Sequence, residues 1–515
     1  MVVVAFTTAI FYNNSFHNRT IHMKKILAFF IILFALNACL VPNRTSKTKH
    51  TTYRPLYHYT PKKNWVNDPN GLVYLDGEYH LFYQHNPFGD KWGHMSWGHA
   101  VSKDLKIWEE LPIAIPETIN QDSSTTMVFS GSVVVDSLNT SGFFEKGFKS
   151  GMVAIYTSHV DKKGVGLEQH QSLAYSIDKG RTWKIYDKNP VLDIGLKDFR
   201  DPYVFSYEGK WRMIVAKPLE FTVQIYESSN LITWKLLSEF GKMGDVAKIW
   251  ECPSLFKVPI ENSNGYKWMM MISSAGEDKD FTGMQYFIGD FDGKTFKPEK
   301  QEGVLRIDYG KDFYAAIPFN NLPQRDKYPI IMAWASNWIY AADIPSEGRR
   351  GMFSMPRKLS LINENDKFHL LQKPIYANNI HTETLALKAG ELSVAKTIEM
   401  PSNSYKLNLS IDLTNAKGFS MNLLENGEEK SVLTYDVNSQ KLSFNRTKSG
   451  KVDFNKNFPS IESMKVTPQN GILNFDIFVD NSIIEIFANS GYTVLTDLVF
   501  PNYKSKLITI KVDKN

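Results

Sequence analysis

The sequence has 515 residues, of which 43% are hydrophobic and 22% charged, and it contains two cysteines. This composition excludes a largely disordered chain and a small scaffold held together by disulfides. At about 150 residues per domain, the length predicts three domains, or two if one is a large β-domain. The net charge of +5 would suit an acidic partner. Whether it indicates one depends on where the positive charges lie along the chain.

Much of this positive charge lies in a segment with the features of an export signal. Lys24 and Lys25 follow Met23, and residues 26–36 form an unbroken apolar run. That run is too short to cross a bilayer, which takes about 20 residues. We expect residues 1–38 to be removed as a signal peptide, with Met23 as the true start. They carry three basic and no acidic residues, so without them the charge of +5 falls to +2. We therefore expect no nucleic-acid partner.

The signal ends in Leu36-Asn37-Ala38-Cys39, which resembles the lipobox of bacterial lipoproteins. Cleavage in such proteins precedes the cysteine, whose thiol then carries diacylglycerol. The resemblance implies a lipid anchor at Cys39 in a bacterial membrane, on its periplasmic or cell-surface face, followed by a polar tether at 39–52. The alternative is an ordinary secretory signal that ends near a cysteine. Both interpretations predict an exported protein.

The chain from Tyr53 onward contains a repeated short pattern, in which a turn of polar residues is followed by an aromatic. Its copies run from Ser102 to Trp108, Ser176 to Trp183, Ser228 to Trp234 and Asp290 to Phe296. Asp, Asn and Gly favour tight turns, so each copy predicts a β-hairpin. Two strand-like runs precede a hairpin, for example 72–75 and 79–83. Four strands per repeat are typical of a β-propeller blade.

The repeats predict five blades within one domain at 53–375. We expect them near 65–110, 128–186, 199–240, 250–300 and 312–361. Beyond residue 379 the repeat ends, and alternating apolar residues at 405–413 and 473–479 predict half-buried strands. The chain is therefore predicted to be all-β, a five-bladed β-propeller followed by a C-terminal β-sandwich at 382–515, with 376–381 as the joint. The alternative for the first part is a stack of sandwiches.

Three blades begin with a carboxylate within two residues before a proline, which marks the first residue of a strand, so we expect these acids just upstream of the innermost strands. These carboxylates are Asp68, Asp201 and Glu251. Because the innermost strands of a propeller line its channel, we expect the three acids to meet at one mouth. Like charges held together raise the pKa of at least one acid, and Arg200 would keep Asp201 ionised. One ionised and one protonated carboxyl suit glycoside hydrolysis. The alternative is that the three motifs are only turn signals.

The motifs at 65–71, 199–202 and 250–253 resemble the signatures of glycoside hydrolase family 32, the invertases, inulinases and levanases. The likeness continues through 129–132, 308–315, 332–338 and 480–487, and so covers about residues 53–510. The resemblance implies the family's five-bladed propeller and β-sandwich. It also implies that Asp68 is the nucleophile, Glu251 the general acid/base and Asp201 the stabiliser of the transition state.

The same resemblance implies a small polyol pocket with polar ligands and aromatic walls. The expected hydrogen-bonding residues are Asn67, Gln84, Ser130 and Arg200. The expected wall residues are Trp65, Trp92, Phe129, Tyr314 and Trp338. In a retaining enzyme the carboxyls of Asp68 and Glu251 would lie about 5–5.5 Å apart.

The function that this resemblance implies is a retaining exo-β-fructosidase acting on levan, inulin or sucrose, with no cofactor and no metal. Four histidines at 80, 85, 94 and 99 lack the spacing of a zinc site, and Cys252 is interpreted as a packing residue. The alternatives are an endo-acting levanase or fructosyltransferase of the same family, a non-catalytic fructan-binding lipoprotein, and an adhesion module. The oligomeric state stays open.

Overall fold

The structure is a computed structural model that describes residues 53–514 except 248, 276–282, 324 and 389–394. The predicted signal peptide, Cys39 and the tether therefore lie outside the described residues. In the described part, regular structure is almost entirely β-strand, and the helices are two short 3-10 turns, η1 (Pro218–Glu220) and η2 (Asn489–Gly491). None of the helices in these ranges is long and apolar enough to cross a membrane.

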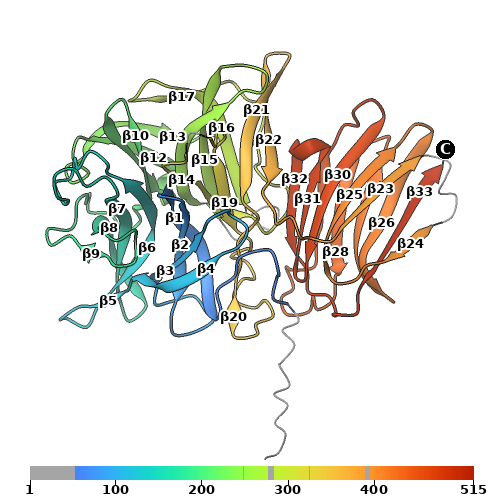
Figure 1. Ribbon diagram of the computed structural model, residues 1–515, viewed down its shortest axis with the longest axis horizontal. Helices are drawn as coiled ribbons and strands as arrows, with labels where there is room; N and C mark the ends of the chain where they lie inside the picture. The colour runs from blue at the N-terminus through green and yellow to red at the C-terminus, as the bar shows by residue number, and fades with distance from the viewer. Residues whose placement is uncertain (1–52, 248, 276–282, 324, 389–394, 515) are drawn as a thin grey trace, which may run out of the picture. The chain divides into compact units, whose positions relative to one another are not determined.

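Five sheets make up the first part of the described chain (Figure 1). The first contains β1 (Asn64–Leu75), β2 (Glu78–Asn86), β3 (Ser96–Ser102), β4 (Glu109–Ile115) and β20 (Arg349–Arg350). The second contains β5 (Thr118–Ile119), β6 (Thr125–Val135), β7 (Met152–Lys162), β8 (Val165–Ser176) and β9 (Lys184–Ile185). The third contains β10 (Arg200–Tyr207), β11 (Lys210–Lys217), β12 (Thr222–Ser228) and β13 (Lys235–Gly241).

The fourth and fifth sheets have four strands each. The fourth contains β14 (Ile249–Pro259), β15 (Tyr266–Ala275), β16 (Gly283–Phe291) and β17 (Phe296–Pro298). The fifth contains β18 (Tyr314–Pro318), β19 (Ile330–Trp334), β21 (Arg357–Glu364) and β22 (Lys367–Pro374). This last sheet runs on past residue 361, where the sequence pattern predicts its end.

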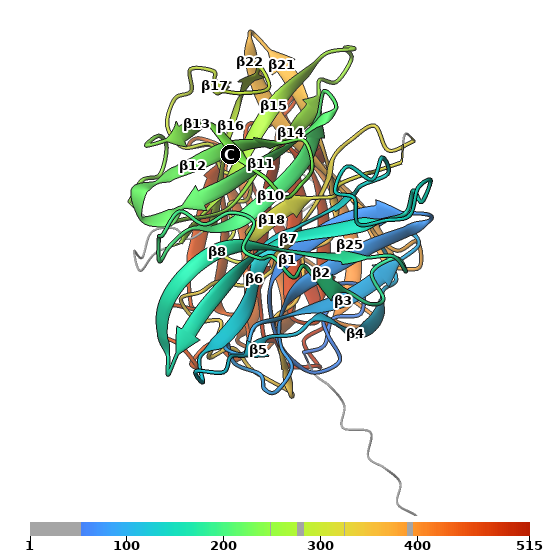
Figure 2. The same ribbon diagram turned by 90° about the vertical axis from the view of Figure 1, so that its left-hand side faces the viewer.

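The five sheets close into a ring around their innermost strands (Figure 2). β1 contacts β6, β6 contacts β10, β10 contacts β14, β14 contacts β18, and β18 contacts β1. The short β20 joins the first sheet by pairing in parallel with β1. The prediction of a five-bladed β-propeller is therefore confirmed, and the alternative of stacked sandwiches is wrong.

The repeated polar pattern forms the turn between the third and fourth strands of a blade. In the first copy, Ser102 Oγ accepts the Leu105 N–H at 2.9 Å, and Asp104 Oδ1 accepts the Lys106 N–H at 2.9 Å. In the second copy, Trp183 Nε1 donates to the Gly180 carbonyl at 3.0 Å. The serine and aspartate satisfy backbone donors of the turn, which explains why these residue types recur there.

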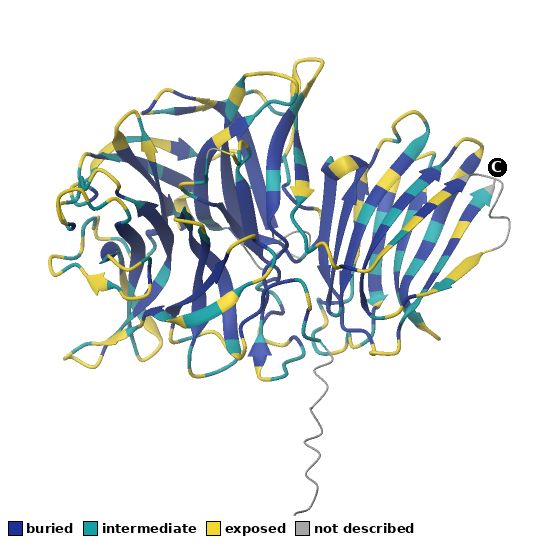
Figure 3. Cartoon of the chain, viewed as in Figure 1, coloured by how far each residue is buried: buried dark blue, intermediate teal, exposed yellow. Residues whose placement is uncertain are grey.

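Two sheets form the C-terminal β-sandwich. One contains β23 (Thr382–Lys388), β25 (Ser404–Asp412), β30 (Ile472–Asp480), β31 (Ile483–Ala488) and β32 (Thr493–Leu498). The other contains β24 (Lys396–Glu399), β33 (Leu507–Lys514), β26 (Ala416–Asn426), β27 (Glu429–Asp436), β28 (Lys441–Lys448) and β29 (Ile461–Lys465). Apolar side chains from both sheets share one core, and buried positions run through them in Figure 3.

Buried ion pairs connect the propeller to the sandwich. Arg357 of β21 lies 2.9 Å from Asp308 and 2.9 Å from Glu485 of β31, and all three side chains are almost fully buried. Arg446 of β28 lies 2.5 Å from Asp312, again with both side chains buried. Buried charges are tolerated when they are paired and hydrogen-bonded. The motifs at 308–315 and 480–487 thus supply the carboxylates that hold the two domains together.

One carboxylate of the sandwich, Asp480, binds three successive backbone N–H groups of the segment before β1. Asp480 accepts the backbone N–H groups of Leu56, Tyr57 and His58 at 2.8–3.0 Å. The His58 ring bridges two acids, with Nδ1 2.9 Å from Asp480 and Nε2 3.2 Å from Glu485. Burial by itself lowers the pKa of His58, but the hydrogen bonds and charges of both acids outweigh it and raise that pKa to about 9.

This histidine makes stability fall at alkaline pH. A raised pKa means that the folded state holds the proton more tightly, so the contribution is complete below the ordinary value of 6.5 and is lost as pH rises to about 9. The lost stability amounts to about 3 kcal/mol at 1.36 kcal/mol per pKa unit. Urea unfolding across this range should show the loss in wild type and a much flatter profile in His58→Asn. Equal slopes in both proteins would contradict the assignment.

Candidate active site

Every innermost strand of the propeller has a β-bulge near its start. The strand register shifts between Val66 and Pro69, Val128 and Gly131, Arg200 and Tyr203, Glu251 and Ser254, and Tyr314 and Ile317. Asp201, Cys252 and Ala315 adopt positive φ angles of 65°, 47° and 55° in three of these bulges. A bulge redirects side chains locally. The three acids therefore lie within their strands, at bulges, and not upstream of the strands as the prolines suggested.

The bulges bring the three predicted carboxylates together. Cys252 Sγ lies 3.6 Å from Asp68 Oδ2 and 3.7 Å from Asp201 Oδ2. Arg200 lies 3.0 Å from Glu251 and 4.0 Å from Asp201. Asp68 and Asp201 are buried and Glu251 is partly exposed. Residues far apart in the sequence thus meet because they occupy similar positions in three blades.

Asp68 is oriented by neighbours on two blades. Ser130 Oγ donates to Asp68 Oδ2 at 2.7 Å, and Asn67 Nδ2 donates to Oδ1 at 3.1 Å. Trp65 Nε1 in turn donates to Asn67 Oδ1 at 2.7 Å. Burial, followed by the charge of Glu251, raises the pKa of Asp68, although these hydrogen bonds partly oppose the shift. Asn67 and Ser130, predicted as sugar ligands, thus also fix the direction of the carboxylate.

Glu251 receives hydrogen bonds from both neighbouring blades. Arg200 Nε and Nη2 donate to Oε1 at 3.1 and 3.0 Å, and Tyr314 Oη donates to Oε2 at 2.6 Å. Arg200, Glu251 and Tyr314 each stand directly before the residue with positive φ in their bulge. Equivalent positions in adjacent blades therefore contact one another, and Tyr314, predicted as a wall of the pocket, is a buried hydrogen-bond partner of Glu251.

Arg200 lowers the pKa of Asp201, as expected, but burial and the neighbouring acids outweigh it. Burial raises the pKa of Asp201, and the charges of Glu251 and Asp68 add to this rise, although Arg200 opposes it. Arg200 makes its closest contacts with Glu251 and with Asp198, 2.7 Å away. The Arg200 guanidinium therefore lies closer to Glu251 of the next blade than to Asp201, its neighbour in the sequence.

Aromatic side chains surround the carboxylates. Trp65 is buried, and its ring stacks at 6.1 Å on Trp338, which is partly exposed. Trp334 is fully buried beneath them. Phe129 is partly exposed and meets Trp92, which is 46% exposed, at 6.1 Å. Of the two tryptophans at 334 and 338, the second is thus the accessible one.

Gln84 connects the first two blades at this end of the propeller. Its side chain is buried, and Nε2 donates to the Val128 carbonyl at 3.0 Å. This bond uses one of the two amide hydrogens, so the second hydrogen and the side-chain carbonyl remain for a ligand.

Sequence reasoning missed two side chains around this cluster and gave a third, Cys252, only a packing role. Gln169 and Asp198 both accept hydrogen bonds from Arg200, at 3.3 and 2.7 Å. Cys252 does more than pack, because its N–H donates to Asp201 at 3.0 Å and its thiol faces two carboxylates. Burial and these negative charges raise the pKa of the Cys252 thiol well above its usual value, so it stays protonated and can donate. No local sequence pattern could identify Gln169 as part of this cluster, because its partner Arg200 belongs to another blade.

The opposite end of the inner strands is bridged by one asparagine. Asn320 Nδ2 lies 3.0 Å from the carbonyls of both Val133 and Val204, and Asn320 Oδ1 accepts from Tyr203 Oη at 3.1 Å. Val133 and Val204 lie beyond the bulges of β6 and β10. The three inner strands of blades two, three and five are therefore tied together away from the carboxylates.

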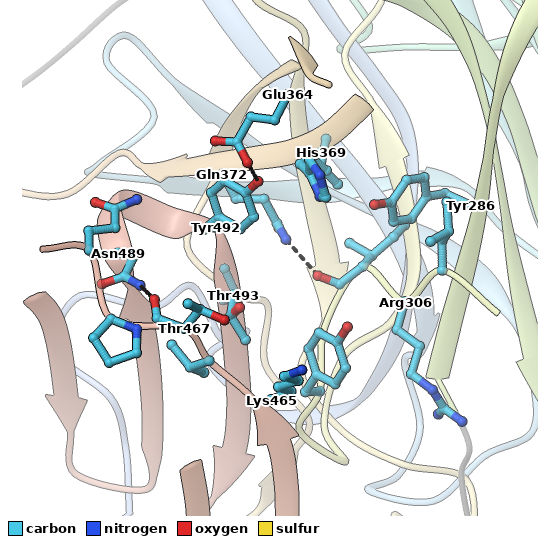
Figure 4. Close-up of a pocket in the computed structure, with 18 residues that line it drawn as sticks. Tyr286, Arg306, Glu364, His369, Gln372, Lys465, Thr467, Asn489, Tyr492 and Thr493 are labelled. Atoms are coloured by element: carbon cyan, nitrogen blue, oxygen red, sulfur yellow. Dashed lines mark hydrogen bonds between the residues drawn. The ribbon is translucent and has the colours of Figure 1, made fainter. Parts of the chain in front are cut away.

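A separate cavity of about 550 Å³ lies between blades four and five and the sandwich (Figure 4). Its polar side chains are largely engaged with the protein itself. Tyr492 donates to Glu364 at 2.7 Å, Asn489 to the Thr467 carbonyl at 2.9 Å, and Gln372 to the Ile307 carbonyl. It includes none of the three clustered acids. In the described ranges, no group of three His, Cys, Asp or Glu side chains is placed to hold a metal ion.

Comparison with known families accounts for nearly the whole described chain. The N-terminal domain of glycosyl hydrolases family 32 matches residues 58–374, and the C-terminal domain of the same family matches 370–515. The chain belongs to glycosyl hydrolase family 32. It is therefore a glycoside hydrolase, as the three signature motifs implied, and the matched regions correspond to the propeller and the sandwich.

Individual family 32 relatives are similar over most of their length. A levanase of Bacillus subtilis is 42% identical over 501 residues, covering 94% of this chain and 72% of the levanase. The crystal structure of an exo-inulinase from Aspergillus awamori superposes with a TM-score of 0.81 at 35% identity, covering 90% of this chain and 97% of that one. A fructofuranosidase of Schwanniomyces occidentalis in complex with fructose gives 0.80 at 32% identity, with coverages of 90% and 95%.

Proposed function

We propose that this family 32 enzyme is a retaining exo-β-fructosidase that releases terminal β-D-fructofuranosyl residues from fructans such as levan and inulin, and from sucrose. The observation that carries the proposal is the single cluster of Asp68, Asp201 and Glu251 at the bulges of three inner strands. The levanase, exo-inulinase and fructose-bound fructofuranosidase support the substrate class.

In the proposed reaction Asp68 attacks the anomeric C2 of the terminal fructosyl unit. Glu251 gives a proton to the departing oxygen, and the C2–O bond breaks as the bond to Asp68 forms. Glu251 then accepts a proton from water, the water oxygen bonds to C2 as the bond between C2 and Asp68 breaks, and fructose leaves with its configuration retained. Asp201 would bind fructose hydroxyls and stabilise the transition state. The expected separation of about 5–5.5 Å between the Asp68 and Glu251 carboxyls is part of this proposal.

The side chains around the cluster support these roles. Ser130 and Asn67 direct the Asp68 carboxylate, and Tyr314 and Arg200 hold the Glu251 carboxylate. We assign the rings of Trp92, Phe129 and Trp338 and the side-chain amide of Gln84 to the fructosyl pocket, with the buried ring of Trp65 stacked on Trp338. Sugars present CH faces to aromatic rings and hydroxyls to amides.

We favour exo action. Asn320 ties three inner strands together at the far end of the propeller, so we expect a chain end to enter from the carboxylate side. Early products from levan, inulin and sucrose should therefore contain free fructose without intermediate oligosaccharides, as thin-layer chromatography can show. A ladder of oligosaccharides at early times would favour endo action instead. Longer products made from concentrated sucrose would favour fructosyl transfer.

We further propose that the enzyme is exported and carries a lipid on Cys39, which lies outside the described residues. The basic pair at 24–25, the apolar run at 26–36 and the lipobox-like end support this location. Cells expressing the wild-type chain should incorporate labelled palmitate into it and retain it in the membrane fraction. Cys39→Ser should lose the label. A label that persists in this variant would contradict lipidation at Cys39.

A further inference from the structure

A chain of hydrogen-bonded side chains leads from the second blade to Glu251. His159 of β7 and Gln169 of β8 stand opposite each other in the strand register. Gln169 Nε2 lies 3.1 Å from His159 Nδ1, and Gln169 Oε1 accepts from Arg200 Nη1 at 3.3 Å. Arg200 then donates twice to Glu251. A side chain of blade two is thereby connected to the acid of blade four.

The buried amide of Gln169 fits in one orientation. Its Oε1 accepts from the Phe199 N–H at 3.0 Å as well as from Arg200. Gln169 is only 3% exposed. A flipped amide would turn its NH₂ group against both of these donors. Nε2 therefore faces His159, and Nδ1 of that ring must be the acceptor. This requires a neutral imidazole that carries its hydrogen on Nε2.

The surroundings of His159 also favour the neutral ring. Burial lowers its pKa, the charge of Arg200 lowers it further, and Asp161 on its own strand and Asp198 beside β10 oppose the shift. From β6, the uncharged ring of Phe129 stacks on His159 with 4.4 Å between centroids and 7° between planes. From β8, the uncharged Gln169 and the backbone of Gly166 lie against the ring.

We propose that His159 and Gln169 are positioning residues for the acid/base, and that protonation of His159 breaks their hydrogen bond and loosens the hold of Arg200 on Glu251. The inference rests on the proposed function, since it assigns a partner to Glu251 in that reaction. A protonated Nδ1 and the amide NH₂ would both be donors. Gln169 could relieve this conflict only by turning away from Arg200 and Phe199, which leaves buried donors unpaired. Misplacement of Glu251 would then lower kcat more than it changes KM.

Two substitutions at position 159 separate the hydrogen bond from the ring. His159→Asn keeps an acceptor on the same γ carbon but cannot be protonated at neutral or acid pH. His159→Phe keeps the ring that stacks on Phe129 but has no acceptor. With sucrose as substrate, the asparagine variant is expected to keep kcat at pH 7 within about 2-fold and to lose one ionisation from the acid limb of the kcat profile. The phenylalanine variant is expected to lose about 10-fold in kcat with little change in KM.

Gln169→Glu provides a second measurement if His159→Phe does not fold. A carboxylate at 169 still accepts from Phe199 and Arg200, and it can also accept from protonated His159. The acid limb of the kcat profile of Gln169→Glu should therefore lose the same ionisation as that of His159→Asn. His170→Asn is the matched control, because His170 neighbours Gln169 and also has a pKa lowered by burial, but its ring lies near Glu168 at 3.6 Å. Its kcat profile is expected to match wild type.

An unchanged acid limb in both His159→Asn and Gln169→Glu would overturn the inference, even if His159→Phe were less active. Failure of the proposed function gives a different result, since wild type would then release no fructose, or Asp68→Asn would release it as fast as wild type. The two outcomes are read from different variants and cannot be confused.

Discussion

Asparagine in place of Asp68 is expected to lower kcat for fructose release from sucrose by about 10,000-fold, the scale at which removal of one central catalytic group acts. The amide keeps the shape of the side chain but cannot form the fructosyl ester. Steady-state rates of purified Asp68→Asn, measured beside wild type, test this directly. A variant with wild-type activity would reject Asp68 as the nucleophile, whereas a wild-type protein that binds fructan but releases no fructose would favour the fructan-binding lipoprotein.

The same substitution should leave the protein at least as stable as wild type. Burial and the charge of Glu251 both disfavour the ionised Asp68 carboxylate, so an uncharged amide removes an unfavourable interaction. Thermal unfolding is expected to show an unchanged or higher midpoint. Asp290→Asn is the control, because that exposed carboxylate pairs with Lys267 at 3.3 Å on the surface and should leave kcat within about 2-fold. A large loss of stability in Asp68→Asn would mean that lost activity reports misfolding.

Replacement of Arg357 by methionine is expected to cost about 3–5 kcal/mol of stability, the usual effect of removing one partner from a buried ion pair. The substitution leaves the carboxylates of Asp308 and Glu485 buried with their guanidinium partner gone. Arg357 also lies over the Phe313 ring at 4.2 Å, next to Tyr314, so activity should fall with stability. Urea unfolding of Arg357→Met measures the effect.

Arg181→Met provides the control for this prediction. Arg181 makes two hydrogen bonds of 2.8 Å to Glu78, but its side chain is 37% exposed. An exposed pair of this kind contributes about 0–1 kcal/mol. If both variants unfold at the same urea concentration, the buried network does not hold the domains together as inferred.

These two predictions concern opposite uses of buried charge. At the active site, carboxylates lie together with one nearby guanidinium, and the pKa values of Asp68 and Asp201 rise as a result. At the domain interface, Arg357 and Arg446 each face carboxylates, so the charges are compensated. The first arrangement costs stability and provides reactive groups, whereas the second stabilises the fold around them.

Sequence periodicity was enough to predict the blades and the meeting of the acids. The polar turns before Trp108, Trp183 and Trp234 recur because each blade needs the same turn, and the ring then brings equivalent positions to one axis. Periodicity does not say which neighbours touch. Arg200 stands beside Asp201 in the chain but binds Glu251. The bulge at Asp201, where φ is 65°, turns the side chains of Arg200 and Asp201 in different directions.

The sequence by itself therefore determined the all-β class, the two domains and the three acids, because all of these depend on local turns and on repeat phase. Only the tertiary structure decided that Arg200 and Tyr314 hold Glu251, that Gln169 links Arg200 to His159, and that Asp480 binds the segment before β1. Each of these contacts joins residues of different blades or domains. Their geometry depends on bulges and on ring closure, which local sequence patterns do not encode.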